Sequence, residues 1–205
     1  AHGYNDKQEL DFKPREEAFD PKVYADILAT SKKIVAVGEC GLDYYRLPDG
    51  KEREMKAKQA KAFEAQQQFA IDNKLPIVIH CREAHADQFA MIKALPNDRR
   101  GVIHCFTGTY EEAKRYVEMG WMISFSGIAV FANEVGEVST KLPLDSILIE
   151  TDSPYLTPPP YRGKRNEPLY VQYVAENIAQ RRGMTLEALA EATTANACKI
   201  FGITV

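Results

Sequence analysis

Four side chains that can bind metal stand at or near the ends of short apolar runs in this sequence. Glu39 closes the run KIVAVGE, His80 lies near the end of PIVIHC, His104 lies in GVIHCF, and Asp152 closes SILIETD. Imidazole and carboxylate groups are ligands that zinc, manganese and similar divalent ions accept. A carboxylate such as Glu39 can also bridge two ions, which suits a two-metal site for hydrolysis. The sequence therefore predicts a divalent-metal site if the fold brings these residues together.

Each of these residues also has an ordinary structural interpretation. A lone histidine after a strand is more often a hydrogen-bonded core residue, because buried polar groups usually find partners. Glu39 follows a glycine and can cap a turn, and Asp152 precedes Ser-Pro and can form an Asx-turn. The repetition of the pattern in four of five runs favours the metal interpretation. His85, within the helix-like stretch REAHADQF, is by contrast expected on the surface.

Five short apolar runs must position these side chains. They are rich in valine and isoleucine and cover residues 33–39, 76–81, 101–106, 121–127 and 146–152. Most are continuous rather than alternating, which is typical of parallel strands covered on both faces. Helical patterns lie between them at 52–73, 87–95 and 111–119, and another at 21–30 precedes the first strand. The alternation predicts an α/β fold in which all strand ends meet on one face.

The last part of the chain differs from this alternating region. From Pro168 to Ile203 only helix is expected, divided in two near residues 183–185, where Thr185 can cap the second helix. The proline-rich segment 157–168 is expected to form a long loop beside the site. No second core follows this loop, so residues 1–205 are interpreted as one domain.

Composition and charge limit the class of protein. The 205 residues carry a formal net charge of −3, which disfavours coating of nucleic acid by charge alone. Without a long apolar window or a leader-like start, we expect neither a membrane span nor export. The four cysteines are then expected to be reduced thiols of a cytoplasmic protein. No obligate protein partner is indicated.

Several linked motifs resemble those of the TatD-type metal-dependent deoxyribonucleases. They are GECGLDYY at 38–45, IHCREA at 79–84, IHCFTG at 103–108, ETDSPYLTP at 150–158 and RGKRNEP at 162–168. The resemblance covers nearly the whole chain and implies a (β/α)8 TIM-barrel fold of the amidohydrolase type. It also implies a hydrolase of DNA, often an exonuclease, with two divalent ions. Magnesium or manganese is the expected working metal, and zinc is a further option.

The resemblance also implies a role for each matching residue. Glu39 corresponds to the glutamate that bridges the two ions in the family. His80 and His104 correspond to ligands of one ion. Asp152 corresponds to a ligand of the other ion and to the group that accepts a proton from the attacking water.

Residues that contact the substrate are expected around this site. Arg82 is expected to contact a phosphate, and a salt bridge to Glu39 or Asp43 is the alternative use of its side chain. Asn166, in the proline-rich loop with three basic residues, is expected to grip a nucleic-acid backbone, although such charge runs are more often simply solvated. The expected substrate is DNA, single-stranded or at 3′ ends.

One part of the family pattern is missing from the sequence. Family members begin with a strand that carries a His-x-His pair, whereas the four histidines here (His2, His80, His85 and His104) include no such pair. We therefore expect the first strand–helix unit to be absent and the domain to be N-terminally incomplete. Two alternatives stay open: a metal-dependent hydrolase of another ester, such as aminoacyl-tRNA, and an inactive fragment or binding module.

Overall fold

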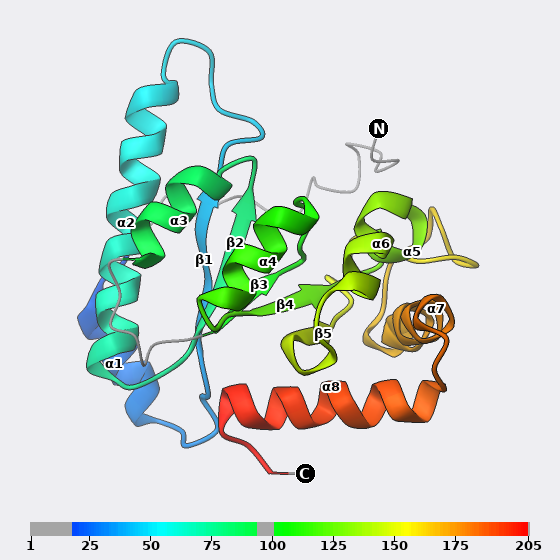
Figure 1. Cartoon of the computed structure of the whole chain (residues 1–205). Helices are drawn as coiled ribbons and strands as arrows, with labels where there is room; N and C mark the ends of the chain where they lie inside the picture. The colour runs from blue at the N-terminus through cyan, green and yellow to red at the C-terminus, as the bar shows by residue number, and fades with distance from the viewer. Residues whose placement is uncertain (1–17, 94–100, 205) are drawn as a thin grey trace.

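Parallel strands alternate with helices in the computed structural model, which describes residues 18–93 and 101–204 (Figure 1). The strands are β1 (Val37–Asp43), β2 (Ile77–Arg82), β3 (Gly101–His104), β4 (Met122–Phe125) and β5 (Ile147–Ile149). They form one sheet in the order β1-β2-β3-β4-β5, and every neighbouring pair is parallel. The predicted α/β class is confirmed, and the sequential parallel order is that of a (β/α)8 barrel of the TIM type.

The helices connect and follow the strands. They are α1 (Pro21–Ala29), α2 (Glu52–Asp72), α3 (His85–Lys93), α4 (Tyr110–Glu118), α5 (Ile128–Phe131), α6 (Asn133–Lys141), α7 (Val171–Arg182) and α8 (Leu186–Phe201), with 3₁₀ turns η1 (Leu144–Ser146) and η2 (Pro168–Tyr170). Every predicted helix has a counterpart among them, although the last two residues of the one predicted at 87–95 lie outside the described residues. The sequence interpretation missed α5 and α6. Of the described helices, none is long and apolar enough to cross a membrane.

Local sequence explains several helix boundaries. Thr109 and Glu112 form a reciprocal capping box at the start of α4. Thr185 caps α8 as predicted, because its side chain accepts a hydrogen bond from the backbone of Ala188. Gly183 ends α7 in the left-handed conformation, with φ of 65°. The two terminal helices are therefore separated where the sequence predicted.

The main core lies between the sheet and helices α2 to α7. Ile79, Ile103 and Ile123 are fully buried there, together with Phe63 of α2 and Tyr116 of α4. These isoleucines occupy equivalent positions in β2, β3 and β4, so their side chains form one layer on one face of the sheet. This layer holds the strands in register, because a shift of one residue would turn it to the other face.

A smaller cluster covers part of the opposite face. Val102, Met122 and Leu148 are buried against α8, where Phe201 packs on them. Figure 1 shows α8 crossing below the strands, at the end where β1 begins. The interpretation of the strands as covered on both faces therefore holds for β3, β4 and β5 at this end of the sheet.

His85 corrects the sequence analysis, which placed it on the surface. The residue is 9% exposed and lies at the first position of α3. Its Nδ1 atom is 3.0 Å from the hydroxyl of Tyr116 and 3.3 Å from the sulfur of Cys81, and burial lowers the pKa of its imidazole. The first turn of α3 faces α4 and the core, so the helical position that looked exposed in the sequence is enclosed.

Candidate metal centre

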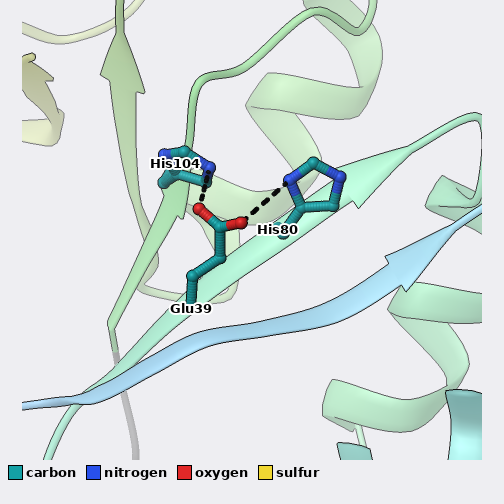
Figure 2. A group of neighbouring side chains, drawn as sticks. All are labelled: Glu39, His80 and His104. Atoms are coloured by element: carbon teal, nitrogen blue, oxygen red, sulfur yellow. Dashed lines mark ion pairs between the residues drawn. The ribbon is translucent and has the colours of Figure 1, made fainter. Parts of the chain in front are cut away.

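Three of the four predicted ligands come together on three adjacent strands, β1, β2 and β3 (Figure 2). One ligand atom from each of Glu39, His80 and His104 lies within 4.8 Å of the others. His80 and His104 are direct partners in the β2–β3 register, and their ring centroids are 5.7 Å apart. The sheet thus places two imidazoles and one carboxylate where a single cation can meet all three.

Glu39 reaches this position through an irregularity in β1. The sequence predicted that the strand ends at Glu39, but β1 runs from Val37 to Asp43 and Glu39 is its third residue. Pairing with β2 passes from Val37↔Ile77 to Cys40↔Ile79, so β1 contains one extra residue between these pairs. A bulge of this kind turns a side chain out of the regular alternation and is common beside active sites. The Glu39 side chain is accordingly 53% exposed.

Two glycines allow β1 to approach β2 closely around Glu39. A Cβ atom at Gly38 would lie 2.7 Å from the Cβ atom of Val78. Gly41 has φ of +146°, and a Cβ atom there would lie 2.0 Å from the carbonyl oxygen of His80. Both positions therefore require glycine, and the motif GECG serves to seat Glu39 against β2.

His104 is held from its far side by a second carboxylate. Its Nδ1 atom lies 3.0 Å from Oε1 of Glu150, and the hydroxyl of Ser124 donates to Oε2 of Glu150 at 2.6 Å. The sequence analysis quoted Glu150 but assigned it no role. Its signal was its position directly after β5, two residues beyond Leu148.

His80 is held in the same manner by Asp43. The Nε2 atom of His80 lies 3.0 Å from Oδ2 of Asp43. Arg82 donates to both oxygens of this carboxylate, from Nε at 3.1 Å and from Nη2 at 2.6 Å. The alternative for Arg82, a salt bridge to Asp43, is therefore present, and contact of Arg82 with a phosphate stays a prediction.

Asp152 lies beside the three-residue cluster rather than within it. β5 ends at Ile149, so Asp152 belongs to the following loop and not to the strand end that the sequence predicted. Its backbone is left-handed, with φ of 59°. Burial raises the pKa of Asp152 to about 6, and the charges of His104, Glu150, Glu39 and His80 also act on it. The carboxyl group thus belongs to the same electrostatic site.

Asn166 stabilises the loop that follows Asp152. It is 2% exposed, and its amide group donates to the carbonyl oxygens of Thr151 and Tyr155. Arg162, in the same loop, donates to Thr157 and lies 3.8 Å from the ring centroid of Phe131. Substrate contact by Asn166 stays a prediction that these hydrogen bonds do not support.

The electrostatics of the cluster favour an anionic Glu39 and a cationic partner. The hydrogen bond with His104 lowers the pKa of Glu39 despite the opposing effect of burial. Burial lowers the pKa of His104, but its hydrogen bonds to Glu150 and Glu39 outweigh burial and raise this pKa to about 10. In the metal-free protein a protonated His104 therefore balances the charge of the carboxylates around it.

The donor set fits a divalent metal. Two imidazoles and a carboxylate are common ligands of zinc, manganese and iron, and carboxylates also suit magnesium. Nδ1 of His80 lies 3.7 Å from one carboxylate oxygen of Glu39, and Nε2 of His104 lies 2.7 Å from the other. These residues of the described chain form the candidate metal centre.

Comparisons with known proteins agree with this chemistry. The family model described as TatD related DNase matches residues 10–202. An Escherichia coli K12 protein named uncharacterized metal-dependent hydrolase YcfH is 41% identical over 189 residues, which is 90% of this chain and 69% of that protein. A Citrobacter rodentium protein named 3′-5′ ssDNA/RNA exonuclease TatD is 38% identical over 189 residues, which is 87% of this chain and 69% of that protein.

Solved structures show the same similarity in three dimensions. The TatD homologue YjjV from Escherichia coli K12 superposes with a TM-score of 0.79 at 28% identity, over 90% of this chain and 70% of that one. A TatD-family hydrolase from Entamoeba histolytica also gives a TM-score of 0.79, at 25% identity over 97% of this chain and 72% of that one. The chain belongs to the TatD-related DNase family of metal-dependent hydrolases.

Proposed function

We propose that this protein is a divalent-metal-dependent deoxyribonuclease that removes nucleotides from the 3′ ends of single-stranded DNA. The observation that carries the proposal is the convergence of Glu39, His80 and His104 within 4.8 Å, with the half-buried Asp152 beside them. The name of the Citrobacter rodentium relative, a 3′-5′ ssDNA/RNA exonuclease, supports the substrate class and the polarity.

Each residue of the centre has a proposed role. Glu39, His80 and His104 would hold a divalent ion, and Asp152, together with Glu39, would contribute to holding a second. Bound divalent ions would stabilise negative charge on the phosphate and make water more acidic. Magnesium or manganese is the proposed working metal.

The protein's own groups perform the remaining steps. Asp152 orients the attacking water and accepts its proton on the carboxylate. The water oxygen then bonds to phosphorus, the bond from phosphorus to the 3′ oxygen of the preceding nucleotide breaks, and this oxygen leaves as a hydroxyl after taking up a proton from solvent. Arg82, whose side chain is 40% exposed and held by Asp43, donates to a phosphate oxygen. Asn166 keeps the Asp152 loop in place.

The proposal also covers organisation and location. We infer that residues 1–205 act as one catalytic domain in the cytoplasm and that its partner is the DNA substrate. The candidate centre and Asp152 beside it use residues from β1, β2 and β3 and from the loop after β5. A site assembled from segments this far apart along the chain depends on one continuous domain.

Digestion of end-labelled single-stranded DNA tests the proposal. The wild-type chain should shorten 5′-labelled DNA stepwise with magnesium or manganese, and chelator should stop the reaction. Asp152→Asn should be inactive while its circular dichroism and melting temperature match the wild type. Asp72→Asn, on the exposed surface of α2, is the matched control and should keep full activity. Absence of cleavage by the wild type with either metal, or full activity of Asp152→Asn, would overturn the proposal.

A further inference from the structure

The two histidines of the metal centre turn opposite ring nitrogens toward Glu39. His104 directs Nε2 at Oε2 of Glu39, at 2.7 Å, whereas His80 directs Nδ1 at Oε1, at 3.7 Å (Figure 2). The nitrogen on the far side of each ring meets another carboxylate. Glu150 meets Nδ1 of His104, and Asp43 meets Nε2 of His80, each at 3.0 Å.

The other hydrogen bonds of Asp43 show that its carboxylate accepts a hydrogen bond from His80. Its two oxygens already accept hydrogen bonds from Arg82, and Oδ1 also accepts from the backbone N–H of Tyr45 at 3.0 Å. A carboxylate that is surrounded by donors in this way is ionised and can only accept. The Nε2 atom of His80 must therefore carry the hydrogen that makes this bond, and its Nδ1 atom keeps the lone pair.

The same reasoning applies to Glu150, which contacts Nδ1 of His104 where Asp43 contacts Nε2 of His80. Ser124, which is 2% exposed, donates its hydroxyl hydrogen to Oε2 of Glu150. The other oxygen, Oε1, accepts from Nδ1 of His104. The lone pair of a neutral His104 ring then lies on Nε2, the nitrogen that points toward Glu39.

We propose that Glu150 and Asp43 are positioning residues that fix the two ligands in opposite tautomers, so that a metal ion binds Nε2 of His104 and Nδ1 of His80. The inference rests on the metal site of the proposed function and goes beyond it by assigning the donor atoms and the residues that set them. Ser124 supports Glu150, and Arg82 supports Asp43. Carboxylates in this position typically contribute about 10–100-fold to metal affinity.

Nuclear magnetic resonance of the zinc-loaded chain, labelled with ¹⁵N in its histidines, tests the tautomers directly. Zinc is diamagnetic, so two-bond proton–nitrogen correlations report which ring nitrogen carries hydrogen and which binds the ion. We expect the Nδ1–H form for His104 and the Nε2–H form for His80. The same tautomer at both residues, or the reverse assignment, would overturn the inference.

Zinc affinity measured by calorimetry tests the positioning residues separately. Glu150→Ala and Asp43→Ala should each bind zinc about 10–100-fold more weakly. Glu150→Gln and Asp43→Asn should recover part of the loss, because their amide oxygens still accept from the imidazole. Recovery by these variants separates positioning from a general loss of folding, which the melting temperature of each metal-free variant also monitors.

A matched serine pair provides the control. Ser124 and Ser126 are both 2% exposed and lie two residues apart, but Ser126 contacts the sulfur of Cys105 instead of Glu150. Ser124→Ala should weaken zinc binding, and Ser126→Ala should leave it unchanged. Undiminished affinity in Glu150→Ala and Asp43→Ala would overturn the inference and leave the proposed function intact. Failure of the wild type to bind zinc would overturn both.

Discussion

Oε2 of Glu39 lies 2.7 Å from Nε2 of His104, although the two residues stand 65 positions apart in the chain. The contact crosses β2, which lies between β1 and β3 in the sheet. The bulge in β1 brings the Glu39 carboxylate across its neighbour to the imidazole of the next strand. This contact defines the centre of the candidate site.

Replacing Glu39 with glutamine should greatly weaken metal binding. The substitution keeps the shape but removes the negative charge that meets both histidines. Metal affinity should fall by more than the ~10–100-fold that is typical when a residue that only supports a metal ligand is replaced. Titration of manganese or zinc into the metal-free chain measures it. Glu54→Gln, on the exposed surface of α2, should bind metal normally, and equal affinities of the two variants would contradict the assignment of Glu39.

The metal-free protein should lose stability as the pH rises above neutrality. Despite burial, hydrogen bonds to Glu150 and Glu39 raise the pKa of His104 from 6.5 to about 10 in the folded state. The folded state therefore holds this proton more tightly than the unfolded chain. Its stabilisation is complete below pH 6.5 and disappears as the pH approaches about 10.

Urea unfolding of the chelator-treated chain across this pH range measures the effect. The free energy of unfolding should fall with rising pH in the wild type and fall less in His104→Gln. Identical pH profiles of the two proteins would contradict the electrostatic account of His104.

Alanine at Gly41 should destabilise the fold by about 3 kcal/mol or more. Its φ of +146° is unfavourable for alanine, and the added Cβ atom would lie 2.0 Å from the carbonyl oxygen of His80. Gly163→Ala is the control, because Gly163 also has positive φ, +82°, but nothing lies within 4 Å of its added Cβ atom. That variant should lose about 1 kcal/mol. Denaturant unfolding compares them, and equal losses would show that the close approach of β1 to β2 is unimportant.

Asn166→Ala should lower both stability and activity. It leaves two carbonyl oxygens without their amide donor, which should cost about 1–3 kcal/mol. One of them belongs to Thr151, the neighbour of Asp152, so the proposed proton acceptor should lose its fixed position. Thermal unfolding and the rate of DNA hydrolysis measure the two effects. Asn73→Ala removes one hydrogen bond, to Phe69 at the end of α2, and should leave the rate unchanged. A normal rate in Asn166→Ala would exclude this role.

The sequence predicted the strands and the cluster because both depend on local patterns. Continuous valine and isoleucine runs marked the strands, and the parallel arrangement then required their ends to share one edge. His80 and His104 therefore became neighbours in the prediction as they are in the sheet. The helix α2 was equally clear, because its 21 residues are dominated by alanine, glutamine, lysine and glutamate.

The parts that were missed depend on contacts between distant segments. α6 contains Gly136 and several β-branched residues, which are poor helix formers, and packing of Val135 and Val138 in the core stabilises it instead. The bulge at Glu39 arises from the register with β2, which no single run reveals. The sequence analysis did not assign Asp43 and Glu150 as partners of the two histidines. Their roles depend on which ring nitrogen each histidine directs toward Glu39.

On the face of the sheet that α8 partly covers, the side chains change from apolar to polar within two residues along β3 and at the end of β5. Val102 packs against α8 whereas His104, two residues later, lies in the candidate metal centre. Leu148 likewise packs against α8, and Glu150, two residues later, contacts His104. A slip of β3 by two residues would keep the same side chains on this face but move His104 into the apolar layer under α8. Such a misaligned sheet would remain compact and yet have no metal centre. Metal binding is consequently a direct readout of strand alignment, which secondary-structure content alone does not report.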